Sequence, residues 1–379
     1  MDTFTQAALG AAVGQAGFSR KLGRHAVWVG ALLGALPDFD IVSRAFGPWA
    51  GIVHHRGATH SLLFAPLVAP LLGYVLWRLL DVRRAKRDGR EPDRGRMPRW
   101  MHLSFWALIT HPLLDWCTSY GTQLGWPLTD ARFAIDAIMI VDPIYTLTLA
   151  AALLVGWIYR QRLRVGQLAG VAALVLTTGY LAFGYHQSQL AKRIATEQLR
   201  AVSFEPVHVR AQPSLLLWMW RVVARDERGD LRVGALSTYK PTWIDFDEVN
   251  RPEHPLVSRA LQSDRGRIFS WFADGFVGVR VEEQGSRTRV VLEDQRYGLV
   301  TQPTEAFWGA VAEFDDQGEL VSVDRFSNHA RGEMKEALRV TWDMMWNGAT
   351  VGRQAAASAS ALEAPEAHAV SSHRPAASL

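Results

Sequence analysis

The residues of this chain that could perform chemistry are acidic side chains and imidazoles gathered in a few short segments. The segment His54-His55-Arg56-Gly57-Ala58-Thr59-His60-Ser61 holds three imidazoles and one guanidinium within eight residues. Imidazole is a common nitrogen ligand of zinc and iron, and Gly57 would let the backbone fold so that His55 and His60 point at one centre. Burial beside the apolar residues that follow would be costly without a partner. A metal site is therefore favoured over histidines that only contact water.

Two further segments offer carboxylates that could complete such a site. Pro37-Asp38-Phe39-Asp40 could bind a divalent cation through oxygen, although the same residues are typical of a turn with carboxylates at a helix end. His111 and Asp115 are four residues apart, which on a helix places both on one face; the alternative is a salt-linked pair that caps the helix. Pro112 predicts a kink at His111 or a new helix that begins at Pro112. Asp142 could be a site residue or the N-cap of the following helix.

These segments adjoin apolar stretches that predict membrane-spanning helices. The 379 residues are 49% hydrophobic and 21% charged, which excludes a disordered chain. The single cysteine, Cys117, excludes a disulfide framework and a multi-cysteine metal site. A helix needs about 20 apolar residues to cross the hydrocarbon of a bilayer. We predict four spans, at residues 61–80, 100–111, 143–159 and 165–185, and two shorter candidates rich in Ala and Gly, at residues 4–18 and 26–36.

Basic residues between the predicted spans indicate their orientation. Residues 83–99 contain eight Lys or Arg side chains, and Arg160, Arg162 and Arg164 separate the last two spans. By the positive-inside rule both loops are cytoplasmic, as is the basic turn at residues 20–24 if residues 4–36 form a helical hairpin. The polar segments then share the outer face, which brings together Asp38, Asp40, His54, His55, His60, His111 and Asp115. Such a cluster is expected to hold one or two divalent metals that activate water.

After residue 185, strand-like alternation replaces the apolar runs and predicts antiparallel strands. They are expected at residues 216–224, 232–237, 268–272, 277–282, 288–292, 307–314 and 320–325, with turns at 227–230, 284–286 and 315–318 and an amphipathic helix at 332–346. The expected fold class is an α-helical polytopic membrane domain followed by an antiparallel β-rich (α+β) soluble domain. The expected domains are a transmembrane helical domain with the metal site (1–188), an extracytoplasmic β-rich domain (189–350) and a disordered tail rich in Ala, Ser and Pro (351–379).

Several motifs resemble those of the YdjM/YfhP family of membrane-bound metal-dependent hydrolases. They are Met1-Asp2-Thr3-x-Thr5, Pro37-Asp38-Phe39-Asp40, His55-Arg56-Gly57-Ala58-Thr59-His60-Ser61, His111-x-x-x-Asp115 and Tyr120-Gly121-Thr122-Gln123, and they cover roughly residues 1–160. Gln6 stands where the family pattern has a histidine, which leaves the number of metals open. The His-x-x-x-Asp spacing is also similar to that of zinc-dependent phospholipase C, which suggests a phosphoester or lipid-headgroup substrate.

The leading hypothesis is a multi-pass hydrolase of the plasma (inner) membrane whose site and C-terminal domain lie outside the cytoplasm. A divalent metal, zinc or a similar ion, would be held by Asp38, His55, His60, His111 and Asp115. Asp40 would be the general base or a second-metal ligand, and Arg56 would bind the substrate anion.

The expected partners are the lipid bilayer and a small-molecule or lipid substrate; no nucleic acid is expected, and the sequence identifies no protein partner. One alternative is a non-catalytic membrane protein whose outer β domain binds an envelope partner. A transporter is disfavoured, because residues 143–159 and 165–185 carry no charge.

Overall fold

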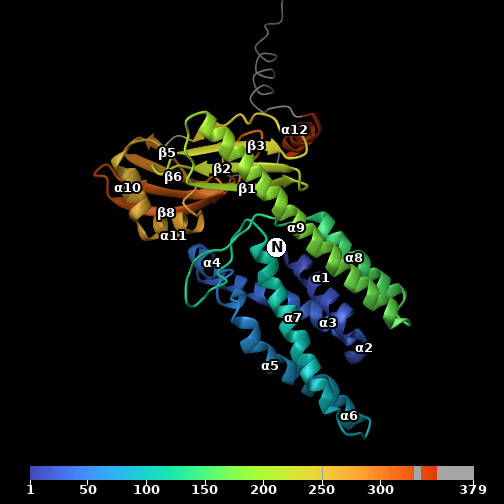
Figure 1. Cartoon of the computed structure of the whole chain (residues 1–379). Helices are drawn as coiled ribbons and strands as arrows, with labels where there is room; N and C mark the ends of the chain where they lie inside the picture. Colours follow the sequence, from blue (N-terminus) through green and yellow to red (C-terminus); the bar gives the residue numbers. More distant parts are fainter. Residues whose placement is uncertain (250, 328–333, 348–379) are drawn as a thin grey trace, which may run out of the picture.

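The computed structural model describes residues 1–249, 251–327 and 334–347. The chain forms a helical part and a β part that lies against one end of it (Figure 1). The helical part contains α1 (Thr3–Val13), η1 (Gly14–Phe18), α2 (Ser19–Leu22), α3 (His25–Ala35), η2 (Leu36–Phe46), α4 (Pro48–His54), η3 (Ala58–His60), α5 (Phe64–Leu76), η4 (Trp77–Val82), α6 (Arg83–Arg87), η5 (Arg94–Arg96), α7 (Met97–Trp116), α8 (Pro143–Ile158) and α9 (Leu163–Ala201).

Three helical segments of the described chain are long and apolar enough to cross a membrane. They are His25–Phe46, Phe64–Arg87 and Leu163–Ala201, and they contain or overlap the stretches predicted at 26–36, 61–80 and 165–185. The span predicted at 143–159 is the shorter apolar helix α8, of 16 residues. The stretches at 100–111 and 4–18 are helical, in α7 and in α1 with η1, but are not among the three.

The helices α1 and α3 form the predicted hairpin. Glycines lie at the contact between the two helices and allow their close approach. A Cβ atom at Gly10 would lie 2.1 Å from the carbonyl oxygen of Gly30, and one at Gly30 would lie 2.2 Å from that of Gly10. A Cβ atom at Gly34 would lie 2.5 Å from the carbonyl oxygen of Gln6. Glycines spaced in this way let two helices approach backbone to backbone. The contact sets the main chain of Gln6 beside the end of α3, while its side-chain Nε2 donates to Asp115 Oδ1 at 3.0 Å.

The β part consists of two antiparallel sheets of four strands each, ordered β1-β2-β3-β4 and β5-β6-β7-β8. Its elements are β1 (His208–Leu215), β2 (Met219–Arg225), β3 (Leu231–Ser237), β4 (Asp247–Val249), α10 (Pro255–Gln262), α11 (Asp264–Phe272), β5 (Val277–Gln284), β6 (Arg287–Asp294), β7 (Trp308–Phe314), β8 (Leu320–Ser327) and α12 (Met334–Asn347). The predicted antiparallel β-rich class is therefore confirmed.

Most of the predicted strands and turns are present. The three-residue strand β4 was not predicted, and there are two further differences. The strand predicted at 268–272 is wrong: these residues end α11, whose N-cap Ser263 accepts a hydrogen bond from the Gly266 N–H. The strand β1 was not predicted, since Pro213 interrupts its pattern. The helix expected at 332–346 corresponds to α12, although residues 332 and 333 lie outside the described residues, as does the tail expected at 351–379.

The helix α9 joins the two parts of the molecule. Its 39 residues, at about 1.5 Å each, span about 58 Å, well beyond the roughly 30 Å of hydrocarbon in a bilayer. The domain boundary expected at residue 188 falls inside this helix. Farther along, Ala191 and Ala195 pack with Trp220 and Val222 of β2 in one hydrophobic cluster. The helix therefore carries the first sheet directly on its final turns (Figure 1).

Two further contacts fix the β part against the loops at this end of the helices. Arg210 of β1 is buried, and its Nε donates to Asp136 Oδ2 at 2.7 Å. Trp49 of α4 belongs to the same hydrophobic core as Phe269 and Phe272 of α11. The β part thus packs on α4 and binds the loop that follows α7.

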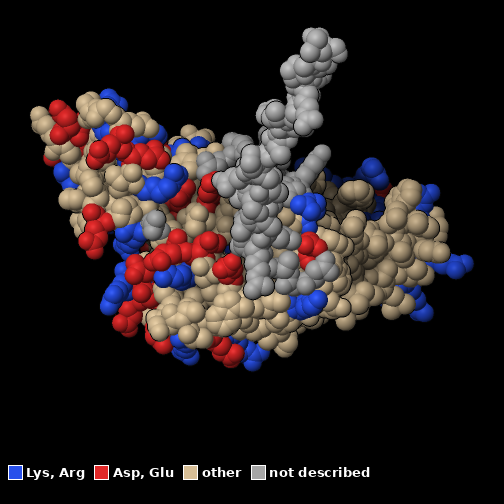
Figure 2. Space-filling view, turned by 90° about the horizontal axis from the view of Figure 1, so that it is seen from above, with Lys and Arg blue, Asp and Glu red and all other residues tan. Residues whose placement is uncertain are grey.

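Charged side chains are distributed unevenly between the β part and the helical part. Figure 2 shows acidic and basic side chains gathered over the β part, whereas the helical part that extends beyond it is mostly uncharged and has Lys and Arg at its far end. The three basic segments of the sequence, at α2, around α6 and between α8 and α9, lie at the end of the helices away from the sheets (Figure 1).

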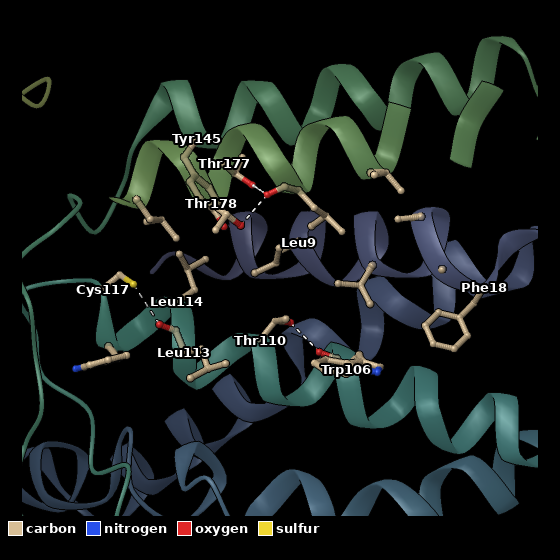
Figure 3. A pocket seen from close by; sticks show the side chains of 17 residues that line it. Leu9, Phe18, Trp106, Thr110, Leu113, Leu114, Cys117, Tyr145, Thr177 and Thr178 are labelled. Atoms are coloured by element: carbon tan, nitrogen blue, oxygen red, sulfur yellow. Dashed lines mark hydrogen bonds between the residues drawn. The ribbon is translucent and has the colours of Figure 1, made fainter. Parts of the chain in front are cut away.

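A groove of about 700 Å³ lies between α1, α7, α8 and α9 (Figure 3). Its threonine hydroxyls donate to carbonyls of their own helices: Thr110 to Trp106 at 3.0 Å, Thr177 to Ala173 at 2.8 Å and Thr178 to Leu174 at 2.7 Å. Because these polar groups are satisfied internally, the groove presents an apolar wall suited to hydrocarbon.

We predict that Gly30→Leu separates α1 from α3 and lowers the unfolding temperature of the detergent-solubilised protein. Overpacking of this kind costs about 1–3 kcal/mol. The matched control is Gly179→Ala, because a Cβ atom at Gly179 of α9 meets nothing within 4 Å. An unfolding temperature unchanged by Gly30→Leu would show that the close approach of α1 and α3 is unimportant for stability.

Candidate metal centre

Asp38, His60 and His111 bring one potential ligand atom each within 4.8 Å of one another. They come from three separate segments, η2, η3 and α7. The Nε2 atoms of His60 and His111 are 3.0 Å apart, and Asp38 Oδ1 lies 3.4 Å from His111 Nε2 and 3.8 Å from His60 Nε2. The structure therefore contains a His/Asp group that could bind a metal ion.

Asp115 places a second carboxylate oxygen beside the two imidazoles. Its Oδ2 lies 3.2 Å from His60 Nε2 and 3.8 Å from His111 Nε2. A tetrahedral zinc ion with ligands at about 2.0–2.1 Å has neighbouring ligand atoms about 3.3 Å apart. The separation between the two imidazole nitrogens and the four separations between a nitrogen and a carboxylate oxygen, 3.0–3.8 Å, bracket that value. Since α7 continues through Pro112 without a new helix, His111 and Asp115 stay one turn apart as the spacing predicts.

Both imidazoles are oriented with their Nε2 lone pairs toward this point. His111 Nδ1 lies 2.6 Å from the carbonyl oxygen of Gly34, which can only accept, so Nδ1 carries the proton. His60 Nδ1 lies 3.1 Å from Asp40 Oδ2 and is a donor for the same reason. In the neutral rings each Nε2 is then free to bind a metal, and the group that fixes each ring lies on its far side.

The surroundings of Asp115 support the fit of a cation. Its Oδ1 receives the α-amino group of Met1 and, at 3.0 Å, the Nε2 of Gln6. Its Oδ2 is buried and accepts no hydrogen bond in the described part of the chain, although Arg56 Nε is 3.0 Å away as an ion pair. Arg56 thus compensates the charge of this buried oxygen, which still has lone pairs that accept no hydrogen bond and could bind a metal ion.

The carboxylates around His60 raise the pKa of its imidazole. Burial alone would lower the pKa of His60, but interactions with Asp115, Asp38 and Asp40 outweigh it and raise the pKa to about 10. The same negative charge that favours a proton on this ring favours a divalent cation beside it.

Asp40 and His55 lie beside the converging atoms and are outside the His/Asp group. Asp40 accepts hydrogen bonds from the Arg56 main-chain N–H at 3.0 Å and the Thr59 hydroxyl at 2.8 Å. Its other oxygen lies 2.7 Å from His55 Nδ1. The ring centroids of His55 and His60 are 6.0 Å apart. Asp40 thus ties the loop at residues 55–60 to η2 and orients both rings.

The conformation of this loop depends on Arg56 rather than on Gly57, which was expected to provide the turn. Arg56 has the left-handed φ of 63°, whereas Gly57 has a φ of −97°. The Arg56 side chain is buried, and its Nη1 donates to the Thr118 hydroxyl at 3.0 Å while its guanidinium carbon lies 4.5 Å from the centroid of the Tyr120 ring. Arg56 therefore lies behind Asp115 and balances its charge.

Several contributors to the site were not identified from the sequence. Thr118 accepts from Arg56 and donates to the carbonyl oxygen of Asp115 at 2.7 Å; its position three residues after Asp115 is the signal that would have found it. The Gly34 carbonyl carries no such signal, because any residue offers one. Asp142 is an N-cap, since its Oδ1 accepts from the Tyr145 N–H at 2.9 Å.

The chain is similar to known membrane proteins over the part that holds this site. The family model described as YdjM inner membrane protein matches residues 1–190. Inner membrane protein YbcI of Escherichia coli (strain K12) is 35% identical over 133 residues, which cover 34% of this chain and 69% of that protein. Uncharacterized protein YfhP of Bacillus subtilis (strain 168) is 23% identical over 301 residues, covering 73% of this chain and 83% of that protein. No solved structure matches the chain. This chain is therefore an inner membrane protein that belongs to the YdjM family.

Proposed function

We propose that this protein is an integral-membrane hydrolase that uses a divalent metal ion held by Asp38, His60, His111 and Asp115. The observation that supports it is the group of Asp38, His60 and His111, whose potential ligand atoms lie within 4.8 Å of one another, with Asp115 Oδ2 3.2 Å from His60 Nε2. A set of two nitrogens and two oxygens suits zinc, although ions of similar preference fit as well.

His55, Asp40 and Arg56, which surround the proposed ligands, would each have a different role in such a reaction. When bound, the ion supplies Lewis acidity toward water and a substrate oxygen. His55 is 13% exposed, its Nδ1 is held by Asp40, and its Nε2 has no hydrogen-bond partner in the described chain, so that this nitrogen is available to take a proton from water. In this proposal Asp40, expected to be the general base, positions His55 and His60, and Arg56 keeps the buried site close to neutral.

A phosphoester or lipid-headgroup substrate is proposed because the site adjoins an apolar surface. Asp38 and Asp40 point inward from η2, whereas Phe39, Val42 and Phe46 of the same segment are 71%, 67% and 84% exposed. Exposed aromatic and aliphatic side chains beside a membrane span are typical of the bilayer interface. A site at that level would meet a headgroup carried by a membrane lipid, and we propose that it faces the outer side, opposite the basic loops.

We predict that the purified protein retains about one zinc or similar ion per chain. His60→Ala and His111→Ala should reduce the content measured by elemental analysis to less than about a tenth, because each removes one of four ligands. His54→Ala is the matched control, since His54 is exposed and outside the group. His55→Ala should also retain metal; loss in that variant would restore His55 to the ligand set, and metal-free wild-type protein would contradict the proposal.

We predict that the metal-loaded protein hydrolyses an activated phosphodiester such as bis(p-nitrophenyl) phosphate, or a phospholipid. His55→Gln should lower the turnover number by about 10²- to 10⁴-fold, the usual contribution of a general base, while the metal content stays unchanged. A rate that is the same for wild-type, His55→Gln and His60→Ala proteins would show that the observed hydrolysis does not arise at this site.

We predict that the β part lies outside the cytoplasm. In a Cys117→Ser background, a cysteine at Glu227 in the β2–β3 turn should react in intact cells with a thiol reagent that cannot cross the membrane, whereas a cysteine at Arg87 should react only after permeabilisation. The opposite labelling would place the β part and the site in the cytoplasm.

A further inference from the structure

A second groove lies on the other side of α1, where α1, α3 and α8 meet. Its volume is about 450 Å³. The floor is made of small residues such as Ala8, Ala11 and Ala31, and Trp28 and Trp157 form its sides. These two indoles are 72% and 62% exposed. Large aromatic surfaces left open beside a membrane-spanning helix must be covered by hydrocarbon or by another helix.

The groove has a charge at one end only. Arg24 is the one charged residue that lines it, and no acidic side chain does. Arg24 is exposed, and its guanidinium has neither an ion pair nor a hydrogen bond within the residues that the structure describes. It lies at the basic end of the helices, next to α2, whose Arg20 and Lys21 add positive charge. An unpaired guanidinium at the mouth of an apolar groove complements an amphiphile with an anionic head.

The dimensions agree with the same kind of ligand. From Arg24 to Ala31 the groove follows about 10 Å of α3, at about 1.5 Å per residue. That is most of the roughly 15 Å depth of one hydrocarbon leaflet. Both indoles lie toward the end marked by Arg24, because Trp28 begins the second turn of α3 and Trp157 is near the end of α8. Tryptophan concentrates at that depth in membrane proteins.

We infer that the groove between α1, α3 and α8 binds an anionic phospholipid, with an acyl chain along its alanine floor and the phosphate at Arg24. Charge complementarity favours this ligand over a second copy of the chain, whose apolar helix would leave Arg24 unpaired. The charged end of this groove, at Arg24, is at the opposite end of the helices from the metal centre, and the inference does not depend on the proposed hydrolase activity.

The test is native mass spectrometry of the full chain in detergent, with phosphatidylglycerol or phosphatidylcholine of identical acyl chains added. We expect the wild-type protein to retain phosphatidylglycerol about fivefold more strongly, the effect of one basic residue on an anionic lipid. Arg24→Gln should remove this preference. Arg94→Gln is the charge-matched control, because Arg94 is exposed at the same end and does not line the groove. Ala31→Phe, which fills the groove, should reduce retention of both lipids.

Three outcomes would overturn the inference. Equal retention of the two lipids by the wild-type protein would remove the role of Arg24. An equal loss in Arg24→Gln and Arg94→Gln would show a diffuse attraction to the basic end rather than a site. A dimer mass without lipid, abolished by Ala31→Phe, would identify a second copy of the chain as the occupant. A metal content unaffected by these variants would show that the metal centre is intact in every case.

Discussion

The Nε2 atoms of His60 and His111 face each other across 3.0 Å, in a buried volume that oxygens of Asp38 and Asp115 also approach. Lone pairs directed at one point repel one another unless a positive charge, from a proton on His60 or from a metal ion, lies among them. Arg56 and the α-amino group of Met1 neutralise Asp115 from behind, but neither lies between the two rings. The need for positive charge at this point, from a proton or a bound cation, is the constraint around which the end of the helical part is built.

Each ligand is placed by a different packing contact, so the site is a property of the whole helical part. The backbone contact between α1 and α3 sets the position from which Asp38 follows. Asp40 fixes the loop that presents His60, and the unbroken helix α7 presents His111 and Asp115 on one face. None of the candidate ligands comes from the β part. Its Arg210 binds the loop that follows α7, and its core around Phe272 packs on α4. A substitution that disturbs one of these packing contacts is therefore expected to displace a candidate ligand as well.

A His-x-x-x-Asp pair on a helix has only one geometry, so the spacing alone places Asp115 beside His111. Residue type and spacing were also sufficient to propose Asp38 and His60, which form a His/Asp group with His111. They were insufficient for His55, whose direction depends on the left-handed backbone of Arg56 and on the hydrogen bonds accepted by Asp40. In the β part, period-two alternation identified most strands, since a strand with one buried face has no other pattern. It failed at residues 268–272, where five residues of mixed polarity suit the last turns of a helix equally well. Contacts distant in sequence, such as Arg210 with Asp136, leave no local pattern.

The continuity of α9 restricts how the β part can move over the candidate metal centre. The helix α9 has 39 residues and no internal break, so it contains no hinge between the bilayer and the sheets. The β part therefore cannot rotate away from the helical part about a flexible segment within α9. Any movement of the first sheet relative to the bilayer then has to follow a tilt of the whole helix. Bilayer thickness, which governs such tilts, would then set how the β part lies over the candidate metal centre.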